Sequence, residues 1–148
     1  MTEILVFDTE TTGLPDWKSP SEAEHQPHLV QLAAHLVDVD TRAIKQTIDL
    51  IIRPDGWVIT PELTEIHGIT HEYACAVGVP EKLAVELFLL MWNGRKRIAF
   101  NTTFDNRLIR IATKRYFDEA ISETWHEGEY ECAMIASRKI MGGKQPNL

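Results

Sequence analysis

The feature that most constrains this chain is the apolar run Ile4–Phe7, which leads directly into two acidic residues. A short, continuous apolar run is typical of a strand buried on both faces of a sheet. Asp8 and Glu10 follow at the end of this strand, and side chains two positions apart project from the same face. Their oxygens can therefore reach one hard cation such as Mg²⁺ or Mn²⁺. A lone Asp-x-Glu pair is more often a capped strand end with a solvated glutamate.

The rest of the chain alternates strand and helix signals around one hairpin, which predicts an α/β domain with a mixed sheet. The 104–116 helix is expected to bury its apolar side chains and to expose Arg107, Arg110, Lys114 and Arg115. The expected elements are an exposed loop over 15–27, hairpin strands over 29–39 and 43–52, helices over 60–67, 80–92 and 104–116, a strand over 97–100, a loop over 125–129 and an apolar segment over 132–140.

Charge and composition restrict the function only mildly. The 148 residues are 44% hydrophobic and 25% charged, with a net charge of −7, so no basic footprint for duplex binding dominates. A site for divalent cations needs clustered carboxylates, however, and the cations then supply the positive field that attracts phosphate. The acidity therefore does not exclude an enzyme that acts on nucleic acid.

No apolar stretch approaches the length of a membrane span, since the longest one, Leu83–Trp92, is interrupted by Glu86. The N-terminus shows neither the basic region nor the cleavage site of a signal peptide. Cys75 and Cys132 are isolated from each other, so we expect reduced, mostly buried thiols in a cytoplasmic protein.

Two further segments carry candidate functional residues. Asp105 follows a short strand and Asn101-Thr102-Thr103-Phe104, at the start of the 104–116 helix. Taken alone, Asp105 would more often be a helix-capping residue. His67 lies in Ile66-His67-Gly68-Ile69, five residues after Glu62. Taken alone, this histidine would more often be a surface or capping residue.

Together these segments resemble the DEDD superfamily of 3′→5′ exonucleases, in its histidine-bearing, proofreading-exonuclease-like branch. Phe7-Asp8-Thr9-Glu10-Thr11-Thr12-Gly13-Leu14 is similar to the first motif of the family, and 101–105 is similar to the second. The His-Gly-Ile segment with its preceding Glu62 matches the part that lies beside the terminal nucleotide. The resemblance covers nearly the whole chain and implies one ribonuclease H-like domain over residues 1–148.

The resemblance implies hydrolysis at the 3′ end of single-stranded DNA or RNA by two Mg²⁺ or Mn²⁺ ions, with a nucleoside monophosphate as product. A DNA polymerase is an implied partner. The implied catalytic and metal-binding residues are Asp8, Glu10 and Asp105, and the implied substrate-binding residues are Thr9, Thr11, Glu62, His67, Asn101 and Phe104.

One departure from the family concerns its third motif, a histidine followed five residues later by an aspartate. After Asp105 the chain offers only Asp118 and His126, in the wrong order and spacing. The resemblance thus implies a chain that stops before this motif and lacks the last helices of the fold, with weak or no activity. Apolar side chains of the first strand or of the 104–116 helix would then be uncovered, so we expect the chain either to self-associate across that face or to be markedly less stable than a version extended past Leu148.

Two alternatives stay open at this point. One is a noncatalytic domain that binds 3′ ends or associates with a polymerase. The other is an oligoribonuclease-like RNA enzyme, because the same carboxylates serve both nucleic acids and recognition of the 2′ hydroxyl depends on the shape of the pocket.

Overall fold

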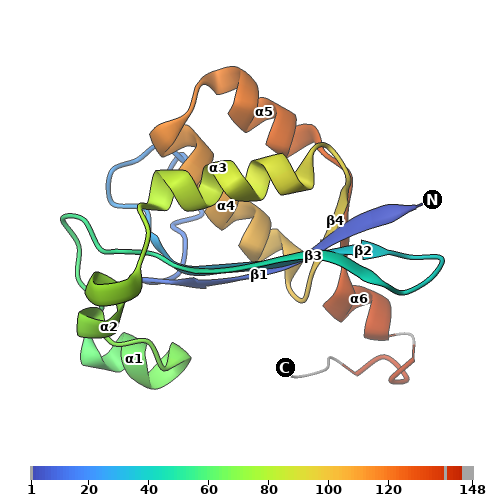
Figure 1. Cartoon of the computed structure of the whole chain (residues 1–148), viewed down its shortest axis with the longest axis horizontal. Helices are drawn as coiled ribbons and strands as arrows, with labels where there is room; N and C mark the ends of the chain where they lie inside the picture. The colour runs from blue at the N-terminus through green and yellow to red at the C-terminus, as the bar shows by residue number, and fades with distance from the viewer. Residues whose placement is uncertain (1, 139, 145–148) are drawn as a thin grey trace.

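A computed structural model describes residues 2–138 and 140–144 of the chain. Its centre is a five-stranded mixed sheet in the order β3-β2-β1-β4-β5 (Figure 1). This confirms the predicted α/β class. The strands are β1 (Glu3–Thr11), β2 (Leu29–Asp38), β3 (Ile44–Ile51), β4 (Lys96–Ala99) and β5 (Tyr130–Cys132).

The central strand β1 has an antiparallel neighbour on one side and a parallel one on the other. It pairs with β2 along its whole length, from Glu3 opposite Asp38 to Thr11 opposite Leu29. With β4 it pairs only over its first half, ending at Val6 opposite Ile98. The far half of β1 therefore has a free edge on the β4 side. The predicted hairpin is confirmed, since β2 and β3 are antiparallel.

The predicted helices are confirmed and begin where local signals place them. Thr60 caps α1 by accepting a hydrogen bond from the N–H of Leu63, and Gly68 ends the helix in the left-handed region at φ 78°. Asn93 ends α3 in the same way. These helices are α1 (Pro61–His67), α3 (Glu81–Trp92) and α4 (Thr102–Tyr116).

Three further helices were not predicted. The first, α2 (His71–Val77), is capped by Thr70, whose side chain accepts from the N–H of Tyr73. The second, α5 (Glu119–Glu127), is capped by Asp118 and contains the residues expected to form a loop around His126. The third, α6 (Ala133–Arg138), occupies part of the predicted apolar segment. Both of the first two begin with a capping residue and an acid in the first turn, which are sequence signals for a helix start.

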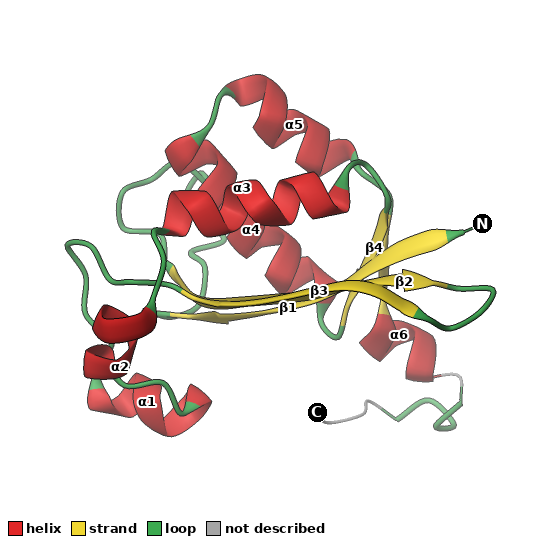
Figure 2. Cartoon of the chain, viewed as in Figure 1, coloured by secondary structure: helices red, strands yellow, loops and turns green. Residues whose placement is uncertain are grey.

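The helices divide between the two faces of the sheet. Helices α3, α4 and α5 cover one face, whereas α1, α2 and α6 lie on the other side, near its two ends (Figures 1 and 2). The main core lies under the first group, where Phe7, Phe88 and Trp125 pack with ring centroids 5.3–5.9 Å apart. A smaller cluster around Val30 and Ile59 lies under α1 and α2.

The prediction that the first strand is buried on both faces is wrong. Leu5, Phe7 and Thr9 are buried, but Val6 is 37% exposed and Asp8 is also exposed. The alternation of a half-buried strand therefore applies to β1. We call the side that carries Asp8 and Glu10 the open face of the sheet.

The segment over 15–27, predicted as an exposed loop, is in part folded against α4. Gln26 is 2% exposed and its side chain donates to the carbonyls of Asp16 and Pro20. The expectation that the basic residues of α4 are exposed is also wrong. Arg107 donates to the Ser19 carbonyl at 2.7 Å and Arg115 to the Gln26 carbonyl at 2.8 Å, so both are partly buried.

Uncovered apolar side chains were expected on the first strand or on the 104–116 helix. The apolar side of α4 is buried, including Leu108 and Ile109, whereas Val6 of β1 is 37% exposed. The two cysteines are free, but Cys75 is exposed and Cys132 only partly buried, contrary to the expected burial. The cytoplasmic location inferred from them stays a prediction. Within residues 2–138 and 140–144, no helix has the length and apolar character needed to cross a membrane.

Candidate active site

Strand β1 presents two carboxylates side by side on the open face. Asp8 lies opposite Ala33 and Glu10 opposite Gln31 in the ladder with β2. Because side chains alternate along a strand, the buried Phe7 and Thr9 point to the core side while Asp8 and Glu10 share the other side. The structure thus brings these two predicted residues together.

Asp105 joins this region from the first turn of α4. It is 4% exposed, and its Oδ1 accepts hydrogen bonds from the Thr9 backbone N–H at 3.2 Å and from the Thr9 hydroxyl at 2.7 Å. The parallel pairing with β4 stops at Val6, so the backbone N–H of Thr9 has no strand partner on that side. Asp105 takes the place of that strand, which fixes α4 against β1.

The three carboxylates are electrostatically coupled. Burial raises the pKa of Asp105 to about 7, the negative charge of Asp8 adds to this rise, and the hydrogen bonds from Thr9 oppose it. Burial raises the pKa of Asp8, and burial and then the Asp8 charge raise the pKa of Glu10. Burial therefore opposes the ionisation of all three carboxylates, the Asp8 charge adds to this at Glu10 and Asp105, and a cation would relieve that cost.

The donor set fits a hard divalent cation in chemistry, since all three side chains offer carboxylate oxygens. The three side chains do not, however, surround a common point as the ligands of one cation would. Among the residues that the structure describes, no group of three or more histidine, cysteine or acidic side chains is gathered around one point. Asp8 and Glu10 are neighbouring carboxylates on one face of β1, and both hydrogen bonds to Asp105 use its Oδ1.

Helix α1 holds the predicted His67 and Glu62. It lies on the open side of the sheet, near the end at which β1 terminates (Figure 1). The Nδ1 of His67 accepts from the Ile69 N–H at 3.2 Å, and its Nε2 is buried without a hydrogen-bond partner in the described part of the chain. Burial lowers the pKa of His67, which favours a neutral ring. Glu62 is exposed in the first turn.

The other predicted substrate-binding residues have varied surroundings. The Thr9 hydroxyl is committed to Asp105, and the Thr11 hydroxyl donates to the Gly13 carbonyl at 2.8 Å. Asn101 is exposed at the start of α4 and makes no side-chain cap, so its amide is available. Phe104 packs partly against the main core. Their contacts with substrate stay predictions.

Two features of this region were not predicted from the sequence. The first is the positioning of Asp105 by Thr9, which depends on where β4 ends. The second is Arg97, which is 1% exposed although it lies in β4. A charged residue inside a predicted buried strand was the available signal for it. His126, dismissed as a substitute base, lines a separate pocket beside Arg97.

Solved structures confirm the fold assignment. E. coli exonuclease I in complex with a dA16 oligonucleotide superposes with a TM-score of 0.76 at 21% identity, over 95% of this chain and 30% of that one. The zinc-ion-bound complex of E. coli exonuclease I with single-stranded DNA gives 0.75 at 21%, over 95% and 30%. A product-bound exonuclease I gives 0.74 at 21%, over 95% and 32%. The chain thus spans about a third of the length of these proteins.

A search of curated proteins finds no relative. The sequence signature of the family described as RNase T, exonuclease, matches residues 5–145. This range includes β1 with its two carboxylates, the Asp105 turn and the α1 segment. The ribonuclease H-like fold and the signature agree, and the chain belongs to the RNase T exonuclease family of the DEDD superfamily.

Proposed function

We propose that this chain is the nuclease domain of a divalent-metal-dependent exonuclease that hydrolyses phosphodiester bonds at the 3′ end of single-stranded nucleic acid. The observation that carries the proposal is the placement of Asp8 and Glu10 on the open face, with Asp105 held against the same strand by Thr9. Membership of an exonuclease family supports the reaction class. The likeness to exonuclease I bound to an oligonucleotide supports a single strand as substrate.

Asp8 and Glu10 would hold a Mg²⁺ or Mn²⁺ ion, with Asp105 completing the site for a second. When bound, the ions supply an activated water and stabilise charge on the phosphate and the leaving 3′ oxygen. The protein's own part would be to hold the carboxylates in place, with the Thr9 hydrogen bonds favouring the ionised form of Asp105. Glu62 and His67 on α1 would contact the terminal sugar and base, since this helix lies on the open side of the sheet.

Metal binding is the first test of the site. Mn²⁺ titrated calorimetrically into the wild type should bind with measurable heat, and Asp8→Asn and Glu10→Gln should each weaken the affinity at least about ten-fold, because each removes a charged ligand. Asp55→Asn and Glu72→Gln remove exposed carboxylates elsewhere and serve as matched controls. Equal affinity in all five proteins would refute the assignment.

Direction and substrate are tested by hydrolysis. A 5′-labelled single strand should shorten stepwise from its 3′ end in Mn²⁺, and a 3′ phosphate on the strand should block the reaction. Release of the 5′-terminal nucleotide first would exclude the proposed polarity. Parallel reactions with DNA and RNA strands of one sequence distinguish a DNA exonuclease from the oligoribonuclease-like alternative.

One observation favours a second candidate function. After Asp105 the sequence contains no histidine followed five residues later by aspartate, so the chain does not itself supply the general base or the fourth carboxylate of the family. A domain that holds 3′ ends, alone or beside a polymerase, would need neither. Tight binding of a 3′ end with no metal-dependent cleavage in any form of the protein would favour this alternative.

A further inference from the structure

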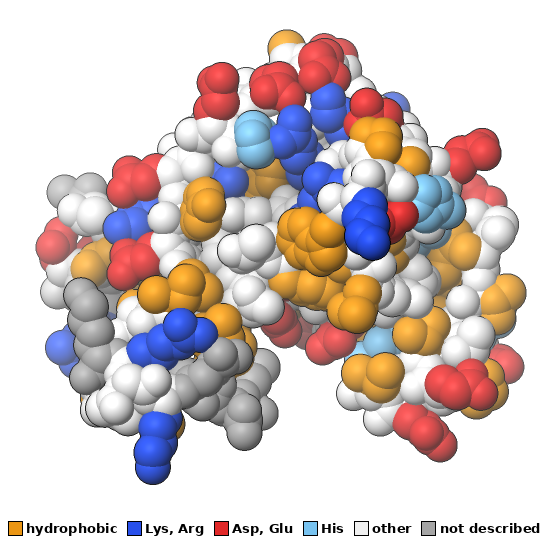
Figure 3. All heavy atoms as spheres, turned by 180° about the vertical axis from the view of Figure 1, so that it is seen from behind, with side chains coloured by type: hydrophobic (Ala, Val, Ile, Leu, Met, Phe, Trp, Pro, Cys, Tyr) orange, Lys and Arg blue, Asp and Glu red, His pale blue; other side chains and the backbone are white. Residues whose placement is uncertain are grey.

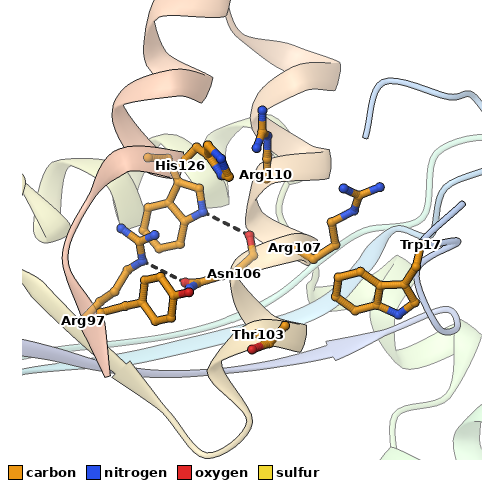
Figure 4. A pocket seen from close by; sticks show the side chains of 9 residues that line it. Trp17, Arg97, Thr103, Asn106, Arg107, Arg110 and His126 are labelled. Atoms are coloured by element: carbon orange, nitrogen blue, oxygen red, sulfur yellow. Dashed lines mark hydrogen bonds between the residues drawn. The ribbon is translucent and has the colours of Figure 1, made fainter. Parts of the chain in front are cut away.

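A second concave site lies beside α4, next to the core residue Trp125. It is a pocket of about 230 Å³ between α4, α5, β4, β5 and the loop that follows β1. Figure 4 shows Arg97 and Trp17 at its two ends, with Arg107 and Arg110 projecting from α4 between them. We call this site the arginine pocket. Three guanidinium groups in one pocket are unusual in a chain whose net charge is −7.

Arg97 is held rigidly at one end of the arginine pocket. Its guanidinium lies 3.6 Å from the ring centroid of Trp125 and 5.6 Å from that of Tyr130. Its Nε donates to the side-chain oxygen of Asn106 at 2.8 Å. The backbone carbonyl of Asn106 accepts a hydrogen bond from the Trp125 indole at 3.1 Å (Figure 4). Stacking on Trp125 and the hydrogen bond to Asn106 fix the plane of the Arg97 guanidinium in the absence of a ligand.

The charge of Arg97 has no counterion in the part of the chain that the structure describes. It is 1% exposed, makes no ion pair there, and its Nη1 is buried without a hydrogen-bond partner. Burial lowers the pKa of Arg97 to about 10, so the group still carries its charge at neutral pH. A buried, unpaired cation is costly unless an anion compensates it.

The neighbouring arginines add unused donors. Arg107 bonds to the carbonyls of Asp16 and Ser19. Within residues 2–138 and 140–144, Arg110 is the only one of the three arginines with an ionic partner, Glu123, at 2.9 Å. The Nε atoms of Arg107 and Arg110 are both buried without a partner among the described residues. Planar guanidinium forks match the oxygens of a phosphate better than other basic side chains do.

Exposed aromatic rings flank the cations. Trp17 is 56% exposed and lies 5.6 Å from the Arg107 guanidinium, and Tyr130 is 52% exposed beside Arg97. On the face drawn in Figure 3, basic side chains lie next to exposed hydrophobic ones while acidic side chains surround them. Basic groups interleaved with aromatic rings are the combination that binds single strands, through the phosphates and through base stacking.

The arginine pocket is built from the same segments as the carboxylate site. Trp17 follows the β1 carboxylates in the chain, and Arg107 and Arg110 follow Asp105 by about 3 and 7.5 Å along the α4 axis. The two sites are therefore close along α4, although Asp8 and Glu10 face the open side of the sheet and the arginines lie on the side of α4 and α5.

We propose that the arginine pocket binds a backbone phosphate of a single-stranded nucleic acid, with neighbouring bases stacked on Trp17 and on Tyr130. The inference rests on the proposed function in taking the substrate strand as its ligand. It adds a second contact that would hold the strand upstream of the cleaved end, separate from Asp8, Glu10 and Asp105.

The test is binding without cleavage. Fluorescence anisotropy of a labelled oligothymidylate of about 12 nucleotides is measured in EDTA over a range of salt concentrations. Trp17→Ala and Tyr130→Ala should each weaken binding about ten-fold. Arg110→Gln should also weaken it and should lower the slope of log affinity against log salt by about 1, because one phosphate contact is lost.

Matched variants control for general effects. Arg53→Gln removes an exposed arginine elsewhere, and Tyr73→Ala removes a tyrosine on α2 that is 53% exposed. Both should bind as the wild type does, and circular dichroism verifies that every variant is folded. Unchanged affinity in all three pocket variants would overturn the proposal. The proposal would also be overturned if the protein did not bind the oligonucleotide but bound a short acidic peptide in an Arg110-dependent manner, since the occupant would then be a protein.

The outcome is independent of catalysis. If the pocket variants lose binding although the wild type cuts nothing, the arginine pocket stands and the proposed hydrolysis fails. If the wild type cuts the strand and the pocket variants bind as it does, the hydrolysis stands and the arginine pocket fails.

Discussion

At the scale of single residues, Thr9 and Asp105 link the fold to the chemistry. Thr9 sits on the buried side of β1, between two carboxylates that face the other way, and gives both its backbone N–H and its hydroxyl to Asp105. Burial opposes the charge of Asp105 and these two bonds favour it. The ionisation of Asp105 therefore depends on Thr9, a neighbour on the buried side of β1.

Asp105 should make the metal-free protein less stable as the pH rises. Its pKa is raised to about 7 in the folded state, above the ordinary 3.8, so the folded state binds more protons than the unfolded state between these values. Stability should fall across that window by an amount on the order of a few kcal/mol. Thermal melts in EDTA at pH 5 and pH 8 should show this slope, and Asp105→Asn should flatten most of it. An unchanged slope in Asp105→Asn, with Asp55→Asn as control, would contradict the assignment.

Thr9→Val should weaken metal binding without removing a ligand. It loses the hydroxyl bond of 2.7 Å to Asp105, and hydrogen bonds to charged groups contribute about 1.5–3 kcal/mol. The pKa of Asp105 should rise further, so the affinity for Mn²⁺ at pH 7 should drop about ten-fold and recover in part at higher pH. Thr9→Ser keeps the hydroxyl and should stay close to the wild type. Calorimetric titration at both pH values decides between them.

At the scale of elements, features set by local signals could be predicted from the sequence, whereas features set by long-range packing could not. The hairpin, α1, α3 and α4 followed from capping residues and hydrophobic period, which act over a few positions. The same signals at Thr70 and Asp118 mark the starts of α2 and α5. The segment that contains Trp125 and Gly128 was nevertheless predicted to be a loop, although α5 extends into it. The arginine pocket could not be predicted, because β4, α4 and α5 meet only in the folded chain.

The end of α2 offers a test of close packing between elements. A Cβ added at Gly78 would collide with the carbonyl oxygen of Ala74 and with the backbone of Arg53. Backbone atoms cannot rotate away, so Gly78→Ala should destabilise the protein by about 1–3 kcal/mol in urea denaturation. Gly13 has no atom within 4 Å of such a Cβ, so Gly13→Ala should change stability by no more than about 0.5 kcal/mol. Equal midpoints for the two variants would argue against the packing of α2 on Arg53.

At the scale of the whole molecule, the open face of the sheet and the buried side of α4 bear on how the protein associates. The open side of β1 carries Asp8 and Glu10 besides Val6, and the apolar residues of α4 are buried under neighbouring helices. The predicted self-association stays a prediction that sedimentation velocity can test. The prediction of one exonuclease-like domain over 1–148 likewise awaits limited proteolysis.

The isolated 148-residue chain should be a feeble nuclease. Loss of a general base typically costs a factor of about 10²–10⁴ in rate, and the sequence contains no histidine at the family's spacing after Asp105. Turnover of a labelled single strand in Mn²⁺ should accordingly be slow and should disappear in Asp8→Asn. Fast cleavage that depends on Asp8 would mean that another residue activates the water, and His126→Ala would show whether this is the histidine of α5.

The one-sided burial of β1 has a consequence for how this protein can vary. Leu5, Phe7 and Thr9 serve the core, whereas Asp8 and Glu10 face solvent and contribute little to packing. Saturation mutagenesis with separate selections for abundance and for nuclease activity should therefore show a two-residue alternation along this strand. Odd positions should tolerate few changes in either selection, and positions 8 and 10 should tolerate many for abundance and very few for activity. Selection could thus change the chemistry of this strand without rebuilding the core beneath it.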